Sequence, residues 1–165
     1  MLKDVLAKVE QIDSQRKELN KELFNLIKKE IISVLDKYPE FIGVRWTQSV
    51  PAFNDGDPCV FSLDEAYFVT SKDVSEVEGY DYDSCNTVEI NEKLYLLYES
   101  ESSWDYKLSK RIYDSLEAEE KENTLKTINK VLYTIKDLLE TEFGSNAEVI
   151  ITKDSIIVNG YSCGY

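Results

Sequence analysis

The sequence predicts an α+β domain, with a mainly antiparallel sheet packed against long helices at the N-terminus and in the C-terminal half. Three observations lead to this class. Apolar residues recur at helical spacing over 1–38 and 102–143, short alternating apolar runs occupy 41–100, and a hairpin pattern covers 148–160. A chain of 165 residues that is 42% hydrophobic can build one packed core, so we expect a single domain over 1–165.

A long helix from Leu2 to Lys37 is the first predicted element, and Pro39 ends it. At 1.5 Å per residue it would span roughly 54 Å, whereas a globule of this size has a radius of gyration near 15 Å. Either the helix bends near Asp13, or the stretch Leu2–Leu26 packs against another copy of the chain. Coiled-coil spacing supports the second alternative, and it is interrupted by Arg16 in the series Val5, Val9, Ile12, Leu19, Leu23 and Leu26.

Short strands follow the helix. The residues around Ile42, Val44 and Trp46 alternate as in a half-buried strand, and a second strand is predicted at Cys59–Leu63. The connection between them contains the turn sequence Asn-Asp-Gly-Asp and has Phe53 near its tip. Residues 71–86 are predicted to form an exposed acidic loop, and 88–98 one or two strands around the pair 91–92.

The second half is predicted to be helical, then a hairpin. Ser102 and Asp105 resemble the two ends of a capping box, and Gly144 is the expected C-terminal cap. A polar interval at 117–123 predicts a break between two helices. The final hairpin is predicted to pair 148–152 with 156–158.

The excess negative charge lies almost entirely in the middle of the chain. The net charge is −13, and residues 54–105 hold fourteen acidic and two basic side chains. Such a field attracts basic protein surfaces and repels nucleic acid and anionic lipid. We therefore expect a basic protein partner, with no direct nucleic-acid binding and no membrane binding.

The residue types also limit the chemistry. The chain has no histidine, which removes Ser-His-Asp and Cys-His nucleophile systems and histidine-ligated metals. Its three cysteines lack metal-ligand spacing, so we expect no cofactor and no zinc site. The first residues lack the apolar region of a secretory signal, and no run reaches the roughly 18 apolar residues of a membrane span. We expect a cytoplasmic protein.

One segment resembles a known group of proteins. It reads Arg45-Trp46-Thr47-Gln48-x-x-Pro51-x-Phe53-Asn54-Asp55-Gly56-x-Pro58-Cys59-x-Phe61. This is similar to a segment of small uncharacterised proteins of tailed bacteriophages and some bacteria, which also begin with a long charged helix. The resemblance brings no activity with it. It implies a setting in which small acidic phage proteins bind and redirect host machinery or block host defences.

The candidate binding residues are aromatic side chains and carboxylates, because aromatic residues anchor interfaces and carboxylates select a basic partner. They are Trp46, Phe53, Asn54, Asp55, Asp57, Tyr80, Asp81, Tyr82, Asp83, Trp104 and Tyr106. Three alternatives stay open. Trp46 and Trp104 can serve the core, the tyrosines can be buried, and Asp55 with Asp57 can hold a calcium or magnesium ion instead of forming a solvated turn.

These observations favour a non-enzymatic acidic binding protein, phage-encoded and acting in the host cytoplasm. It would occlude or redirect a basic host protein surface, as an anti-defence or host-takeover inhibitor does, and a nucleic-acid-handling protein is a suitable target. The alternative is a self-assembling virion or scaffold component that uses the N-terminal helix. A third hypothesis is a hydrolase that uses carboxylates and a metal ion.

Overall fold

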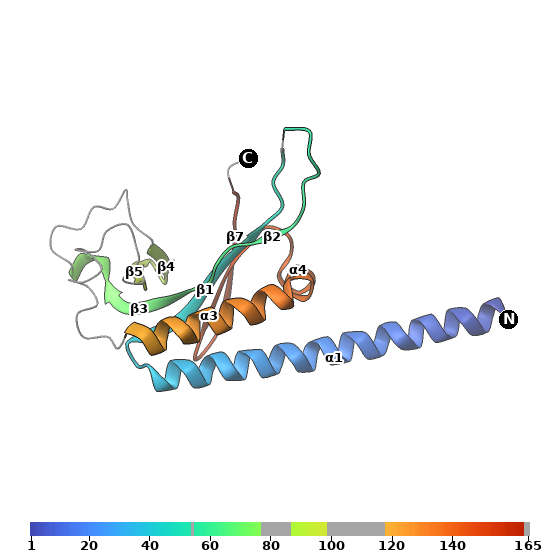
Figure 1. Ribbon diagram of the computed structural model, residues 1–165, viewed down its shortest axis with the longest axis horizontal. Helices are drawn as coiled ribbons and strands as arrows, with labels where there is room; N and C mark the ends of the chain where they lie inside the picture. Colours follow the sequence, from blue (N-terminus) through green and yellow to red (C-terminus); the bar gives the residue numbers. More distant parts are fainter. Residues whose placement is uncertain (54, 77–86, 99–117, 164–165) are drawn as a thin grey trace.

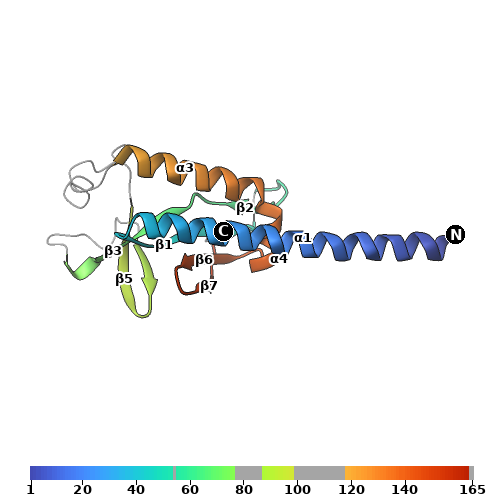
Figure 2. The same cartoon turned by 90° about the horizontal axis from the view of Figure 1, so that it is seen from below.

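The computed structural model describes residues 1–53, 55–76, 87–98 and 118–163. It confirms the α+β class. Helices α1 (Leu2–Lys37), α3 (Ala118–Thr134) and α4 (Lys136–Phe143) cover one face of a curled sheet (Figure 1). Seen from below, α1 and α3 run alongside each other over the sheet (Figure 2). None of the helices in the described ranges is both long and apolar enough to cross a membrane.

The strands in the described residues form one seven-stranded sheet. They are β1 (Phe41–Ser49), β2 (Ser62–Leu63), β3 (Tyr67–Asp73), β4 (Thr87–Ile90), β5 (Lys93–Leu97), β6 (Ala147–Thr152) and β7 (Ile156–Gly160). The order is β4-β5-β3-β1-β6-β7, with β2 also paired to β1, and all of these pairings are antiparallel. The central strand is therefore β1, where Val44 lies opposite Phe68 on one side and Ile151 on the other.

Both faces of the central strands are buried. The main core lies between sheet and helices and includes stacked rings of Phe41 and Phe68, whose centroids are 4.3 Å apart. Side chains that point to the other face of the sheet, such as those of Val69 and Ile150, form a second, smaller cluster. The curl of the sheet brings the β4–β5 hairpin and β7 around that cluster, which explains why β1 has a nearly continuous buried pattern rather than an alternating one.

Helix α1 is continuous through Asp13, so the predicted alternative of a bend there is wrong. Its C-terminal part packs on the sheet through Phe24, Ile31 and Leu35, all buried. Its N-terminal part extends beyond the rest of the molecule, as both views show (Figures 1 and 2). We call residues 2–26 the arm.

Residue 117 and the helix predicted before it lie outside the described residues. Helix α3 ends just before Ile135, and it runs without interruption through 118–123, where the polar interval predicted a break. Tertiary ion pairs explain this. Lys121 is buried and its Nζ lies 2.5 Å from Glu40, while Glu120 pairs with Lys37 at the end of α1. Ion pairs with Lys37 and Glu40 therefore attach the first turn of α3 to the end of α1, although this turn has no apolar stripe.

Other predictions are confirmed in part. The β4–β5 hairpin turns at Asn91 and Glu92, with φ of 53° and 65°, and the β6–β7 hairpin forms as expected. Gly144 ends α4 with φ 86° and donates its N–H to the carbonyl of Glu140.

Of the strand predicted at 59–63, only Ser62 and Leu63 are in a strand, β2. The predicted acidic loop is wrong for 71–76, since 71–73 belong to β3, 74–76 form a 3-10 turn, η1 (Val74–Glu76), and Val74 is buried. Residues 77–86 and the predicted capping box at 102–105 lie outside the described residues.

Candidate functional site

The segment 45–48 of β1, which carries the resemblance described above, is held by contacts with distant parts of the chain. Arg45 Nε donates to Glu148 Oε1 of β6 at 2.9 Å, and Thr47 Oγ1 donates to Asp64 Oδ2 at 2.5 Å. Both pairs are only partly buried, so they fix the register of β1 against its neighbours rather than supply much stability.

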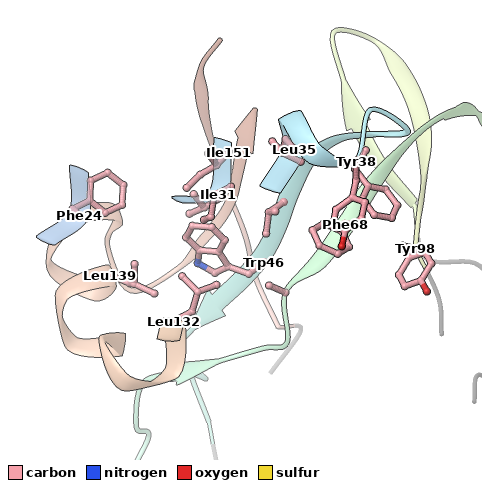
Figure 3. Packing of buried hydrophobic residues seen from close by; sticks show 14 of the residues in the cluster. Phe24, Ile31, Leu35, Tyr38, Trp46, Phe68, Tyr98, Leu132, Leu139 and Ile151 are labelled. Carbon is pink, nitrogen blue, oxygen red and sulfur yellow. The ribbon is translucent and has the colours of Figure 1, made fainter. Parts of the chain in front are cut away.

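Trp46 and Gln48 point into the main core and are completely buried. Trp46 Nε1 donates to Gln48 Oε1 at 3.1 Å, and Gln48 Nε2 donates to the carbonyl oxygens of Leu139 (3.1 Å) and Gly144 (2.5 Å). Figure 3 shows the indole facing Leu132 and Leu139. Trp46 is therefore a core residue, and its prediction as part of a docking surface is corrected. The amide of Gln48 satisfies the indole and ties β1 to α4.

The connection between β1 and β2 is the first candidate site. It stands away from the sheet, beside the C-terminal end of the chain (Figure 1). Phe53 is 66% exposed at this loop, and Asp55 and Asp57 are exposed beside it. Asp55 and Gly56 both have positive φ, 44° and 92°, which is the backbone geometry that the Asn-Asp-Gly turn predicts.

The base of this loop is anchored. The side-chain oxygen of Asn146 accepts a hydrogen bond from the Val50 N–H at 3.1 Å, and the backbone N–H of Asp64 donates to the Thr47 carbonyl at 2.9 Å. A hollow of about 420 Å³ lies at the base. It is lined by Ser49, Pro51, Phe53, Asp55, Ser62, Asp64, Tyr161 and Cys163.

Tyr161 and Cys163 join this site from the far end of the sequence, and sequence reasoning missed both. No local signal marks them, because their place depends on the β1–β6–β7 order of the sheet. The loop carboxylates do not gather into a metal site: no group of three or more Cys, Asp and Glu side chains within the described ranges could hold an ion.

The structure brings Phe53 and Asp55 together at one hollow and separates both from Trp46. Asp57 lies on the same loop. The remaining predicted binding residues lie outside the described residues. They are Asn54, Tyr80, Asp81, Tyr82, Asp83, Trp104 and Tyr106.

The arm is the second candidate site, because its apolar residues are exposed to solvent. Leu2 is 85% exposed, Leu19 63% and Leu26 59%. We call the line Leu2, Val5, Val9, Ile12, Leu19, Leu23 and Leu26 the seam. At its end the seam meets an apolar groove of about 460 Å³ between α1 and α3. The groove is lined by Leu26, Ile27, Glu30, Ile31, Val34, Thr124, Thr127, Ile128, Val131 and Leu132.

Two charged positions have pKa values displaced by hydrogen bonds at the other end of α1. The hydrogen bond between Lys37 and Glu120 raises the pKa of the lysine above 10.5 and lowers that of the glutamate below 4.5. Both side chains are exposed, so this pair orients the end of α1 against α3 and has little effect on stability.

Comparison with known proteins gives no relative: no family model, no curated protein and no solved structure matches this chain.

Proposed function

We propose that the protein is a non-enzymatic binding protein whose acidic, aromatic surface docks on a basic protein. The observation that carries the proposal is the β1–β2 loop, where an exposed Phe53 stands beside Asp55 and Asp57 on an anchored base. An aromatic anchor supplies buried area on binding, and adjacent carboxylates favour a cationic partner and reject an anionic one.

The charge distribution supports the same partner class. Residues 54–105 carry fourteen acids against two basic residues, and the loop begins this stretch. A surface of this sign accelerates association with a positively charged cleft, such as that of a nucleic-acid-handling protein, and can occlude it. We therefore propose a phage-encoded inhibitor that blocks or redirects a basic host protein in the host cytoplasm.

The test compares what the protein retains from a host lysate with what a loop variant retains. The variant carries Phe53→Ala, Asp55→Asn and Asp57→Asn, which leaves the anchored base intact. We expect basic proteins to be retained by the wild type, to be lost by the variant, and to be released from the wild type as salt rises from about 50 to 300 mM.

A matched control carries the same loss of charge elsewhere, Asp154→Asn with Glu142→Gln, at two exposed positions away from the loop. It should retain what the wild type retains. Equal retention by the loop variant, or retention indifferent to salt, would contradict the proposal.

A second candidate function is self-assembly, as in a virion or scaffold component, and the exposed seam of the arm favours it. A helix that leaves apolar side chains in water over most of its length is stable when another surface covers them. Light scattering over a range of protein concentrations tests this candidate. A mass that rises with concentration supports it, and a single-chain mass throughout contradicts it.

A further inference from the structure

We infer that two copies of this chain pair through their arms in antiparallel orientation, with Leu2 of each copy beside Leu26 of the other. This inference rests on the second candidate function, self-assembly, and adds the partner, the orientation and the register.

The arm offers enough apolar area for a stable pair. The seven side chains of the seam are each 40% exposed or more. At on the order of 100 Å² apiece, they would remove roughly 700 Å² per copy from water, close to the roughly 800 Å² per partner of a standard interface. Their alternating steps of three and four residues are the spacing that lets two helices interlock side by side.

Within the described part of the chain, no other element covers this seam, since all seven of its side chains are exposed. A second copy of the chain supplies a surface of matching length and spacing.

The charge on Arg16 decides the orientation. It occupies a core position of the heptad pattern, so in a parallel pair in register Arg16 would face Arg16 of the partner subunit. In an antiparallel pair with Leu2 beside Leu26, Arg16 instead faces Ile12, next to Asp13. Within one helix Arg16 Nη2 already lies 3.5 Å from Asp13 Oδ1. Pairing places two such ion pairs across the two-fold axis, where charges of opposite sign alternate.

The flanking charges agree with this register. With Leu2 beside Leu26, Val5 falls beside Leu23, and Val9 beside Leu19. Lys8, which flanks the seam, then lies near Glu22 of the other helix, and the pair occurs twice by symmetry. A parallel pair would also bring Lys8 beside a carboxylate, that of Asp13, so this pair supports association and the orientation follows from Arg16.

The body of the protein leaves room for this arrangement. Each arm joins its sheet near Phe24, so the two bodies lie at opposite ends of the paired helices and do not meet. The outer end of each arm reaches Leu26 of the other chain, at the mouth of the groove between α1 and α3.

The first experiment measures dimer dissociation by sedimentation equilibrium of the full chain and charge variants. We expect a concentration-dependent dimer for the wild type, and a single-chain mass for Leu19→Glu with unchanged helix content. Lys8→Glu should weaken the dimer roughly tenfold, since it turns two attractive pairs repulsive. Adding Glu22→Lys should restore it, whereas adding Asp13→Lys, the position that faces Lys8 in a parallel pair, should not.

The second experiment fixes orientation by disulfide trapping, in protein whose three cysteines are replaced by serine. A mixture of Val9→Cys and Leu19→Cys chains should cross-link to each other under mild oxidation. Val9→Cys alone should stay uncross-linked, because the two thiols lie about 15 Å apart along an antiparallel pair.

These outcomes distinguish the antiparallel register from self-assembly in general. A dimer that cross-links through Val9→Cys alone, or that is rescued by Asp13→Lys, overturns the antiparallel register and leaves self-assembly standing. A wild-type chain with a single-chain mass at every concentration overturns both.

Discussion

Replacing Gln48 by leucine tests how much of the fold depends on one buried amide. Gln48→Leu keeps the approximate size and apolar stem of the side chain. It removes the acceptor of the Trp46 N–H at 3.1 Å and the donor to the Leu139 and Gly144 carbonyl oxygens at 3.1 and 2.5 Å. All of these contacts surround a completely buried side chain.

The magnitude follows from the groups left without partners. A buried polar group that loses its only partner costs about 1–3 kcal/mol, and the indole N–H is in that position. The two carbonyls sit at the C-terminal end of α4 and add to the loss, although they lie nearer to solvent. We expect Gln48→Leu to lower the free energy of unfolding by about 3–5 kcal/mol, a large share of the roughly 5–15 kcal/mol of a typical domain.

The assay is urea unfolding followed by far-ultraviolet circular dichroism. The same substitution at an exposed glutamine, Gln11→Leu, is the matched control and should change the unfolding free energy by less than about 0.5 kcal/mol. A Trp46→Phe background removes the indole N–H. There Gln48→Leu should cost about 1–2 kcal/mol less than in the wild type, and this difference is the coupling between the two side chains.

A loss below about 1 kcal/mol for Gln48→Leu would refute the reasoning, because it would mean that the amide is not the main partner of these groups. Equal losses in the wild-type and Trp46→Phe backgrounds would refute the assigned contact to the indole while leaving the link to α4 intact.

Further predictions concern other contacts. Gly43→Ala should destabilise by about 1–3 kcal/mol in urea unfolding, since its Cβ would lie 2.9 Å from a backbone carbonyl oxygen of β6, whereas Gly160→Ala has open space and should be near neutral. Hydrogen bonds from the backbone and hydroxyl of Ser75 hold the pKa of Asp73 below 3.8. The stabilisation is therefore present above that pH and is lost as pH falls through the lowered pKa, and an NMR titration of Ser75→Ala should show this pKa returning upward. Lys121→Met breaks the buried ion pair of α3 and should cost about 1–2 kcal/mol, less than a fully buried pair because the partner carboxylate keeps contact with water.

The sequence predicts best those elements whose signals are local. The end of α1 before Pro39, the β4–β5 turn at Asn91 and the cap at Gly144 all have a nearby residue that dictates the backbone, and the structure confirms each. The break at Ile135 has no glycine or proline to announce it. It follows from packing, since it lets α4 turn and bury Leu139 against the sheet.

The candidate sites show the same limit. The turn at 54–57 is a local signal, so the exposed loop with Phe53 could be predicted. For Trp46 the sequence left a core and a surface position open, and the core position is the one found. The contacts that decide between them are distant, because its partner Gln48 is held by Leu139 and Gly144, about a hundred positions away. Tyr161 and Cys163 reach the loop only through the order of the strands.

The position of β1 has a consequence for how the chain is made. One edge of β1 pairs with β2 and β3, the next two strands in the sequence, and the other edge pairs with β6, about a hundred residues later. During synthesis the second edge of β1 must stay unpaired until β6 emerges from the ribosome. Non-local pairing of this kind slows folding and leaves an open strand edge that other chains can join. The nascent protein is thus most vulnerable to aggregation in the interval before β6 is made.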